Sequence, residues 1–337
     1  MTNPIRPPRI HDVAQLAGVS VATVSRVISN PGIVAQATRE AVETAIAATG
    51  YTVNLTARNL RQQQVGGVLA LVPKLANPFF SEILSGISDV LRREGLSLLV
   101  VDTTAVPHQP ARTALASYLS RSRSDGVIVL DGSLDPALFA APGCPPVVQA
   151  CEWNEALQAP RVLADNAAGG RLAARHLTGL GHRRILHLTG PEANTLTIDR
   201  RRGFLDGLAE AGLDAADSPE MTGDFSIASG HAAAARILAL KDRPTAVFCD
   251  NDEMAIGLIT GLIRAGLDVP GEISVMGFDN IEMSAYCLPA LTTIRQHRAR
   301  LGRRAAEVLL SRMRGETVDG TTMLDVELLA RASTGPA

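Results

Sequence analysis

The chain has 337 residues, of which 46% are hydrophobic and 20% charged, a composition typical of globular rather than disordered proteins. Its four cysteines, Cys144, Cys151, Cys249 and Cys287, show no metal-site or paired spacing, which excludes a disulfide-rich secreted scaffold. No proline-poor apolar stretch is long enough to span a bilayer, and Met1–Arg9 lacks a signal-peptide core, so we expect a cytoplasmic protein without membrane contact.

The formal net charge of −2 is unevenly distributed along the chain. Residues 1–61 carry six arginines and three acidic side chains, so the negative balance belongs to the rest of the sequence. A basic N-terminal region on an acidic body favours a phosphate-binding module attached to a domain of another kind.

Residues 10–29 predict two short helices joined by a turn at Gly18, with Ser20 able to cap the second helix. An ordinary helical hairpin would have the same spacing. However, the second helix leaves small or basic side chains off its apolar face, which suits a helix that enters the DNA major groove. These side chains are Val21, Ala22, Ser25 and Arg26. The apolar positions at helical spacing are Val13, Leu16, Ala17, Val24, Val27 and Ile28.

The following segments complete a small helical module. Asn30-Pro31-Gly32 breaks the chain, and Thr38–Ala48 predicts a third amphipathic helix that covers the first two. Residues 54–61 predict one more helix, which is too short to be stable in water by itself.

From Val65 onward, short apolar runs alternate with amphipathic helices, the pattern of parallel sheets covered on both faces. The alternation runs from Val68 to Ala150 and starts again at Arg161, which predicts two α/β lobes with a cleft between them. We expect Thr292-Thr293-Ile294 and a helix from Gly302 to Arg314 to return to the first lobe, and Met323–Leu329 to return to the second.

Ligands of open parallel sheets bind beyond the carboxyl ends of the strands, where this chain places several aromatic side chains. Only 3% of its residues are aromatic, yet Phe79, Phe80, Trp153 and Phe225 all fall on candidate cleft loops. Aromatic faces beside oriented polar groups suit a small ligand with a flat or sugar-like ring. The alternatives are ordinary core positions for these aromatics, a turn residue for Asp279, and a solvated helix start for Arg200-Arg201-Arg202.

The motifs VSVATVSRVISNP and NLTARNLR, and later NPFFSEI, DGVIVL, HLTGP, RPTAVFCDND, VPGEISVMGFDN and PALTTI, resemble the LacI family of transcription regulators in order and spacing. The resemblance implies an α/β protein with an N-terminal three-helix DNA-binding domain, a hinge helix and a two-lobed periplasmic-binding-protein-like effector domain with parallel sheets. The predicted divisions are a headpiece at 1–52, a hinge helix at 53–62 and a ligand-binding and dimerisation domain at 63–337, with an N-subdomain at about 63–162 and 293–321 and a C-subdomain at about 163–292 and 322–337.

The resemblance also assigns roles to residues. It implies effector contacts by ring stacking and hydrogen bonding, which we expect from Phe79, Phe80, Trp153, Arg200, Phe225, Asn251 and Asp279. Asn194 stands where purine-binding members carry arginine, and Cys151 and Trp153 differ from sugar-binding members. The DNA contacts that it implies are Val21, Ala22, Thr23, Ser25 and Arg26 in the headpiece, and Asn54, Ala57, Arg58 and the minor-groove wedge Leu60 in the hinge.

We therefore predict a homodimeric transcription regulator, a repressor, that binds a near-palindromic operator under the control of a nucleoside or a sugar. The alternatives are a two-lobed solute-binding protein and an α/β enzyme. We find no Gly-x-Ser-x-Gly, no phosphate-binding glycine loop and no His-Glu-x-x-His, so we expect no catalytic residue and no cofactor. A metal or acid–base cluster of Asp250, Asp252, Glu253 and Asp279 is a weaker hypothesis than hydrogen bonding to hydroxyl groups, and we expect no metal.

Overall fold

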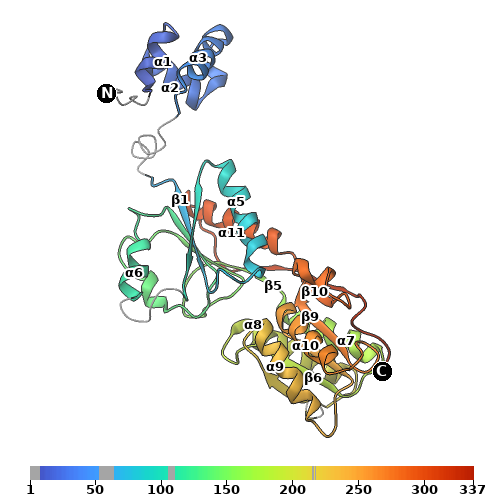
Figure 1. Ribbon diagram of the computed structural model, residues 1–337. Helices are drawn as coiled ribbons and strands as arrows, with labels where there is room; N and C mark the ends of the chain where they lie inside the picture. The colour runs from blue at the N-terminus through green and yellow to red at the C-terminus, as the bar shows by residue number, and fades with distance from the viewer. Residues whose placement is uncertain (1–7, 53–63, 105–110, 215, 217) are drawn as a thin grey trace, which may run out of the picture. The chain divides into compact units, whose positions relative to one another are not determined.

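The computed structural model describes residues 8–52, 64–104, 111–214, 216 and 218–337 (Figure 1). The chain divides into two compact units, 1–63 and 64–337. The described part of the first unit is helical, with elements α1 (Ile10–Leu16), α2 (Val21–Ser29), the 3₁₀ turn η1 (Pro31–Ile33) and α3 (Gln36–Thr49).

The second unit contains two lobes, each built on a six-stranded sheet among the described residues. The first sheet has the order β11-β5-β4-β3-β1-β2, and all its strand pairs are parallel. Its strands are β1 (Gly67–Val72), β2 (Ser97–Asp102), β3 (Gly126–Val129), β4 (Val147–Ala150), β5 (Arg161–Ala164) and β11 (Thr321–Leu324).

Helices cover both faces of the first sheet because its central strands are apolar on both sides. Val68, Ala70 and Val72 of β1 pack under α5 (Phe79–Arg93) and α11 (Arg298–Met313). Leu69 and Leu71 point to the other face, where they join a cluster with Leu115 of α6 (Ala111–Tyr118). The turn η2 (Pro136–Phe139) precedes β4.

The second sheet has the order β12-β10-β9-β8-β6-β7, in which only the β10–β12 pair is antiparallel. Helices α7 and α8 pack on one face of this sheet and α9 and α10 on the other. The strands are β6 (Ile185–Thr189), β7 (Glu220–Thr222), β8 (Ala246–Cys249), β9 (Ser274–Asp279), β10 (Thr292–Gln296) and β12 (Val326–Leu329). The helices are α7 (Asn166–Gly179), α8 (Thr195–Glu210), α9 (Ile227–Leu238), α10 (Asp252–Arg264) and the 3₁₀ turn η4 (Glu282–Ala285).

Glycines bring paired helices into backbone contact. A side chain at Gly86 of α5 would overlap the carbonyl of Ala299 in α11, and one at Gly170 of α7 would overlap the carbonyl of Arg200 in α8. Gly230 of α9 meets the carbonyl of Met254 in α10 in the same way. The helices of each pair therefore lie too close together to accept a Cβ at these positions.

The structure corrects three predicted subdomain boundaries. All of β5 belongs to the first sheet, so the first crossing follows Ala164 rather than residue 162. The strand at 292–296 stays in the second sheet, where Ile294 is fully buried, and the second crossing comes after it. The predicted run Met323–Leu329 is two strands in different sheets, separated at the exposed Asp325, because apolar residues continue on both sides of the crossing and hide it.

Candidate DNA-binding surface and ligand site

The turn between α1 and α2 has the geometry predicted from the sequence. Gly18 has φ +65°, and the amide of Val19 donates to the carbonyl of Ala14 at 3.0 Å. The side chain of Ser20 then caps α2 by accepting from the amide of Thr23 at 3.1 Å. This left-handed turn followed by an N-cap sets the direction of the second helix.

The core of the headpiece contains only apolar side chains among its described residues. The buried ones are Val13, Ala14, Val24, Val27, Val42 and Ala45. Leu16, which we predicted on the apolar face of α1, is instead 59% exposed, because α1 ends there and the chain turns away through Ala17 and Gly18.

The predicted reading face of α2 is accessible. Val21, Ala22 and Arg26 are exposed, whereas Thr23 and Ser25 are half-buried. The hydroxyl of Thr23 lies 2.9 Å from that of Ser20, so it is already part of the N-cap. The predicted hinge residues lie outside the described part of the structure; they are Asn54, Ala57, Arg58 and Leu60.

In the second lobe, Arg200 is 1% exposed, although Arg201 and Arg202 beside it are solvated. Its Nε donates to Oδ1 of Asn166 at 2.9 Å, and its Nη1 donates to the carbonyl of Asp250. Its Nη2 lies 3.5 Å from Oδ1 of Asp279, and the guanidinium stacks 3.9 Å from the centre of the Phe278 ring. Because these partners hold the Arg200 side chain in a defined position inside the lobe, Arg200 is not part of a solvated helix start.

Asp279 is the last residue of β9, is buried, and has φ +116°. Its Oδ1 accepts from Nε2 of Gln296 at 2.7 Å. Burial raises the pKa of its carboxyl group to about 6, while the Arg200 cation limits that rise. A carboxyl group in this setting can accept a hydrogen bond from a ligand hydroxyl.

Asn251 and Phe225 form a second contact at the same edge of the sheet. Oδ1 of Asn251 accepts from the amide of Met254 and caps α10, and its Nδ2 donates to the carbonyl of Phe225, both at 2.9 Å. The Phe225 ring lies over Gly190, where a side chain would overlap it. Arg200 connects the two contacts, because it reaches both Asp279 and the carbonyl next to Asn251.

The first-lobe aromatics form an apolar wall. Phe79 and Phe80 meet edge to face with 5.1 Å between ring centres, and both belong to the same buried cluster as Trp153. Leu196 and Ile281 of the second lobe belong to that cluster too. Phe79, Phe80 and Trp153 thus come from the first lobe, whereas Phe225 and the predicted polar residues come from the second, and apolar side chains pack where the lobes meet.

Sequence reasoning missed Glu152, which is 8% exposed and follows β4 directly before Trp153. Its Oε2 accepts from the amide of Gly132 at 3.2 Å, and its carboxyl group bonds to the side chain of Asn194 in the other lobe. Burial raises the pKa of Glu152 to about 7. The signal available in the sequence was an acidic residue placed at the carboxyl end of a buried strand.

The acidic cluster considered from the sequence has structural partners. Asp250 accepts from the buried ring of His187 and from the amide of Gly190, both at 2.8 Å. Asp252 accepts from the amide of Ile281 and the hydroxyl of Thr293. Within the described ranges, no three His, Cys, Asp or Glu side chains are placed to hold a metal ion.

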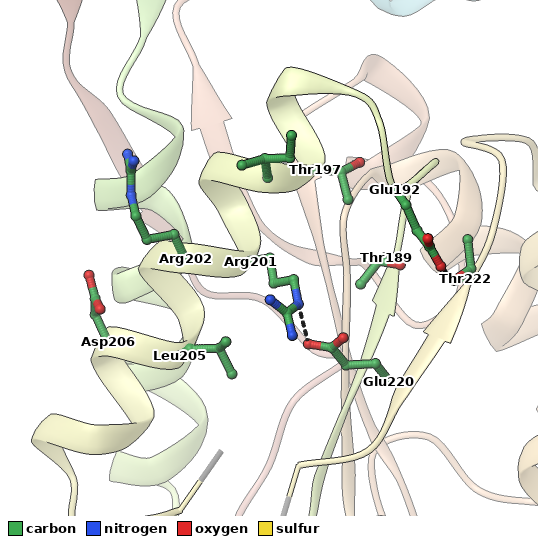
Figure 2. A pocket seen from close by; sticks show the side chains of 10 residues that line it. Thr189, Glu192, Thr197, Arg201, Arg202, Leu205, Asp206, Glu220 and Thr222 are labelled. Atoms are coloured by element: carbon green, nitrogen blue, oxygen red, sulfur yellow. Dashed lines mark hydrogen bonds and ion pairs between the residues drawn. The ribbon is translucent and has the colours of Figure 1, made fainter. Parts of the chain in front are cut away.

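A separate pocket of about 570 Å³ lies beside α8 and strands β6 and β7 (Figure 2). Its walls carry charged groups in ion pairs, such as Nε of Arg201 at 2.7 Å from Oε1 of Glu220. None of the predicted ligand residues lines it. In the part of the chain that the structure describes, no helix is long and apolar enough to cross a membrane.

Comparisons with known proteins agree with this architecture. Residues 9–54 match bacterial regulatory proteins of the lacI family, and residues 174–334 match a periplasmic binding protein-like domain. The chain is 37% identical over 326 residues to the HTH-type transcriptional repressor CytR of Escherichia coli K12, covering 96% of this chain and 95% of that protein. It is 35% identical over 330 residues to the repressor PurR of Photobacterium profundum, covering 96% and 98%.

Solved structures share the whole fold. A crystal structure of the lac repressor dimer bound to operator and the anti-inducer ONPF has a TM-score of 0.82 and 31% identity, covering 98% of this chain and 100% of that chain. A complex of the transcriptional regulator CelR with cellobiose has a TM-score of 0.73 and 30% identity, covering 97% and 99%.

A helix-turn-helix headpiece joined to a two-lobed binding domain defines a DNA-binding transcriptional regulator, and its relatives are repressors rather than enzymes. The chain belongs to the LacI family of bacterial transcription regulators. The resemblance and the fold class predicted from the sequence are thereby confirmed.

Proposed function

We propose that the protein is a homodimeric repressor that binds a near-palindromic operator and whose affinity for that operator is set by a nucleoside or a sugar. It acts on chromosomal DNA in the cytoplasm. The lac repressor relative is a dimer on operator DNA, and the CelR relative holds cellobiose. Two headpieces related by a two-fold axis read two half-sites, so the operator has the same symmetry.

The observation that carries the ligand part is the buried group of Arg200 and Asp279 beside Asn251 and Phe225. Arginine and carboxylate groups held at the carboxyl ends of parallel strands, next to an aromatic ring, match the hydroxyl groups and ring of a ribose or hexose. Glu152 and Asn194 reach the same region from the two lobes and are candidates to contact the rest of the ligand.

Exposed apolar side chains support the dimer. Met283, Tyr286 and Leu288, on and just after η4, are 53%, 81% and 88% exposed. A row of large apolar side chains in solvent is typical of a protein–protein interface. We assign this segment to the contact between subunits.

Operator binding tests the DNA part. Fluorescence anisotropy with near-palindromic duplexes is expected to give tight, salt-dependent binding. Leu60→Ala should weaken it roughly tenfold or more by removing the wedge, while ligand binding stays unchanged. A monomeric protein that ignores every palindromic duplex at low salt would contradict the proposal.

Titration calorimetry tests the ligand part with cytidine, uridine, adenosine and common hexoses. One of these should bind and change operator affinity roughly 5- to 150-fold, the range of ordinary allosteric coupling. Consumption of the ligand would contradict a role as a sensor.

A further inference from the structure

Arg298 is the first residue of α11, directly after the chain crosses from β10 of the second lobe to the first lobe. Its side chain is 3% exposed, although arginines further along the same helix are solvated. A cation buried at a crossing between lobes needs partners, and their positions indicate its role.

The Arg298 guanidinium bonds to both lobes. In the first lobe, its Nη1 donates to the carbonyl of Phe79 at 3.2 Å and its Nη2 donates to Oε1 of Glu82 at 2.8 Å. In the second lobe, Nη2 also donates to the carbonyl of Asn280 at 3.0 Å. The planar fork of arginine can satisfy acceptors on two sides at once, which the single ammonium of lysine does less well.

The second-lobe partner, Asn280, lies in a constrained segment. Asn280 has φ +56° and follows Asp279 at φ +116°. Residues other than glycine rarely adopt a positive φ, and here two consecutive residues do. Nη2 of Arg331 donates to Oδ1 of Asn280 at 2.6 Å, and the backbone amide of Asn280 donates to the hydroxyl of Thr293 at 3.3 Å. A shift of the Asp279 side chain would therefore be passed to the Asn280 carbonyl, where Arg298 is attached.

The first-lobe partners belong to a stiff pair of helices. Gly86 of α5 meets the carbonyl of Ala299, and Gly302 of α11 meets that of Ile83, without room for a side chain. The two helices are in contact through their backbones. A displacement of Arg298 would therefore move α11 together with α5, whose first residue is Phe79.

We propose that Arg298 is a positioning residue that latches the two lobes, linking the Asp279–Asn280 segment to α5 and α11. The ligand-dependent part of this role rests on the proposed function, because Asp279 is a proposed ligand contact. The latch itself depends only on the contacts of Arg298, and it is tested without ligand or operator.

Trp153 reports on the latch because it is the only tryptophan of the chain. It is 9% exposed and shares its cluster with Leu196 and Ile281 of the second lobe. Separation of the lobes exposes this ring to water, which shifts its fluorescence to longer wavelength and increases quenching by acrylamide.

The test compares full-length Arg298→Met with the matched control Arg300→Met, two residues along α11. Arg300 is 56% exposed and pairs with Asp325 on the surface. Arg298→Met should red-shift Trp153 emission and raise its acrylamide quenching constant, Arg298→Lys should give an intermediate value, and Arg300→Met should match the wild type.

Circular dichroism separates the latch from general unfolding. Folded Arg298→Met with wild-type emission and quenching would overturn the proposal. If Arg298→Met does not fold, the test rests on Arg298→Lys. Wild-type quenching of Trp153 in folded Arg298→Lys would also overturn the proposal. A wild-type protein that binds no operator would refute the proposed function and leave the Trp153 result intact.

Discussion

The headpiece and the second lobe are stabilised in different ways. The buried side chains of the described headpiece are all apolar, and its predicted contact residues are exposed or half-buried. The second lobe instead buries Arg200, Asp250, Asp252 and Asp279 among its apolar side chains. A surface that reads DNA can therefore be changed without disturbing its core, whereas the proposed ligand residues of the second lobe are also part of its packing.

The largest expected effect comes from removing the central cation of the second lobe. Arg200→Met removes the cation beside buried Asp279, which keeps only Gln296 as a donor among the described residues, and removes the donor to the Asp250 carbonyl. It should lower the free energy of unfolding by about 3–5 kcal/mol, the usual cost of breaking a buried pair. Chemical denaturation measures this loss, and calorimetry should find no ligand binding. Exposed Arg201, in the next position, is the control. An equal loss of stability in Arg201→Met would contradict the view that the buried Arg200 stabilises the second lobe.

Glu152 gives the wall of the first lobe a pH dependence that the headpiece core should not have. Because its pKa is raised to about 7 in the folded protein, the native state holds a proton that the unfolded chain releases between about pH 4.5 and 7. Stability from this group is therefore present at low pH and lost as pH rises through 7, by up to about 3 kcal/mol.

Glu152→Gln should flatten that part of the pH profile when unfolding is measured at several values between pH 5 and 8. Asp279, with its pKa raised to about 6, gives a slope in the same direction that should persist in the variant. A pH profile of Glu152→Gln identical to that of the wild type would show that Glu152 does not contribute to the pH dependence of stability.

Val24→Ala tests the headpiece from its core. Val24 is fully buried in a small cluster, and the cavity should cost about 2 kcal/mol. Because the second unit has its own core, calorimetry should show only the headpiece transition moving to lower temperature. Operator affinity should fall while ligand affinity stays unchanged, and a shift of both transitions would contradict independent units.

Ser20→Ala gives the smallest expected effect. It removes the N-cap of α2 and should cost about 1 kcal/mol, without exposing any buried charge. The measured quantity is again the headpiece transition. Ser20→Asp is the matched control, because it keeps a capping oxygen and should retain the wild-type transition.

The headpiece and the lobes also differ in how much of their structure could be predicted from the sequence. The headpiece was predictable because its signals are local: a turn glycine, a capping serine and an apolar face within 20 residues. The α/β alternation of the lobes was also predictable. The lobe crossings at 297 and 325 were not, because Thr292–Gln296 and Met323–Leu329 have the same apolar pattern whichever sheet they join.

The predicted ligand residues came from family motifs and strand ends, and the structure brings four of them together in the second lobe. Glu152 and Arg298 were missed for one physical reason. Each has partners that only the tertiary structure brings near: Glu152 bonds to Asn194 of the second lobe, and Arg298 bonds to Phe79 of its own lobe and to Asn280 of the second lobe.

The close helix pairs have a consequence for ligand binding. Gly170 lies against the carbonyl of Arg200, and Gly203, three residues after Arg200, lies against the carbonyl of Ala167, so even an added methyl group would push α7 and α8 apart. We therefore expect Gly170→Ala and Gly203→Ala to shift Arg200 and impair ligand binding, although neither substitution removes a proposed contact side chain.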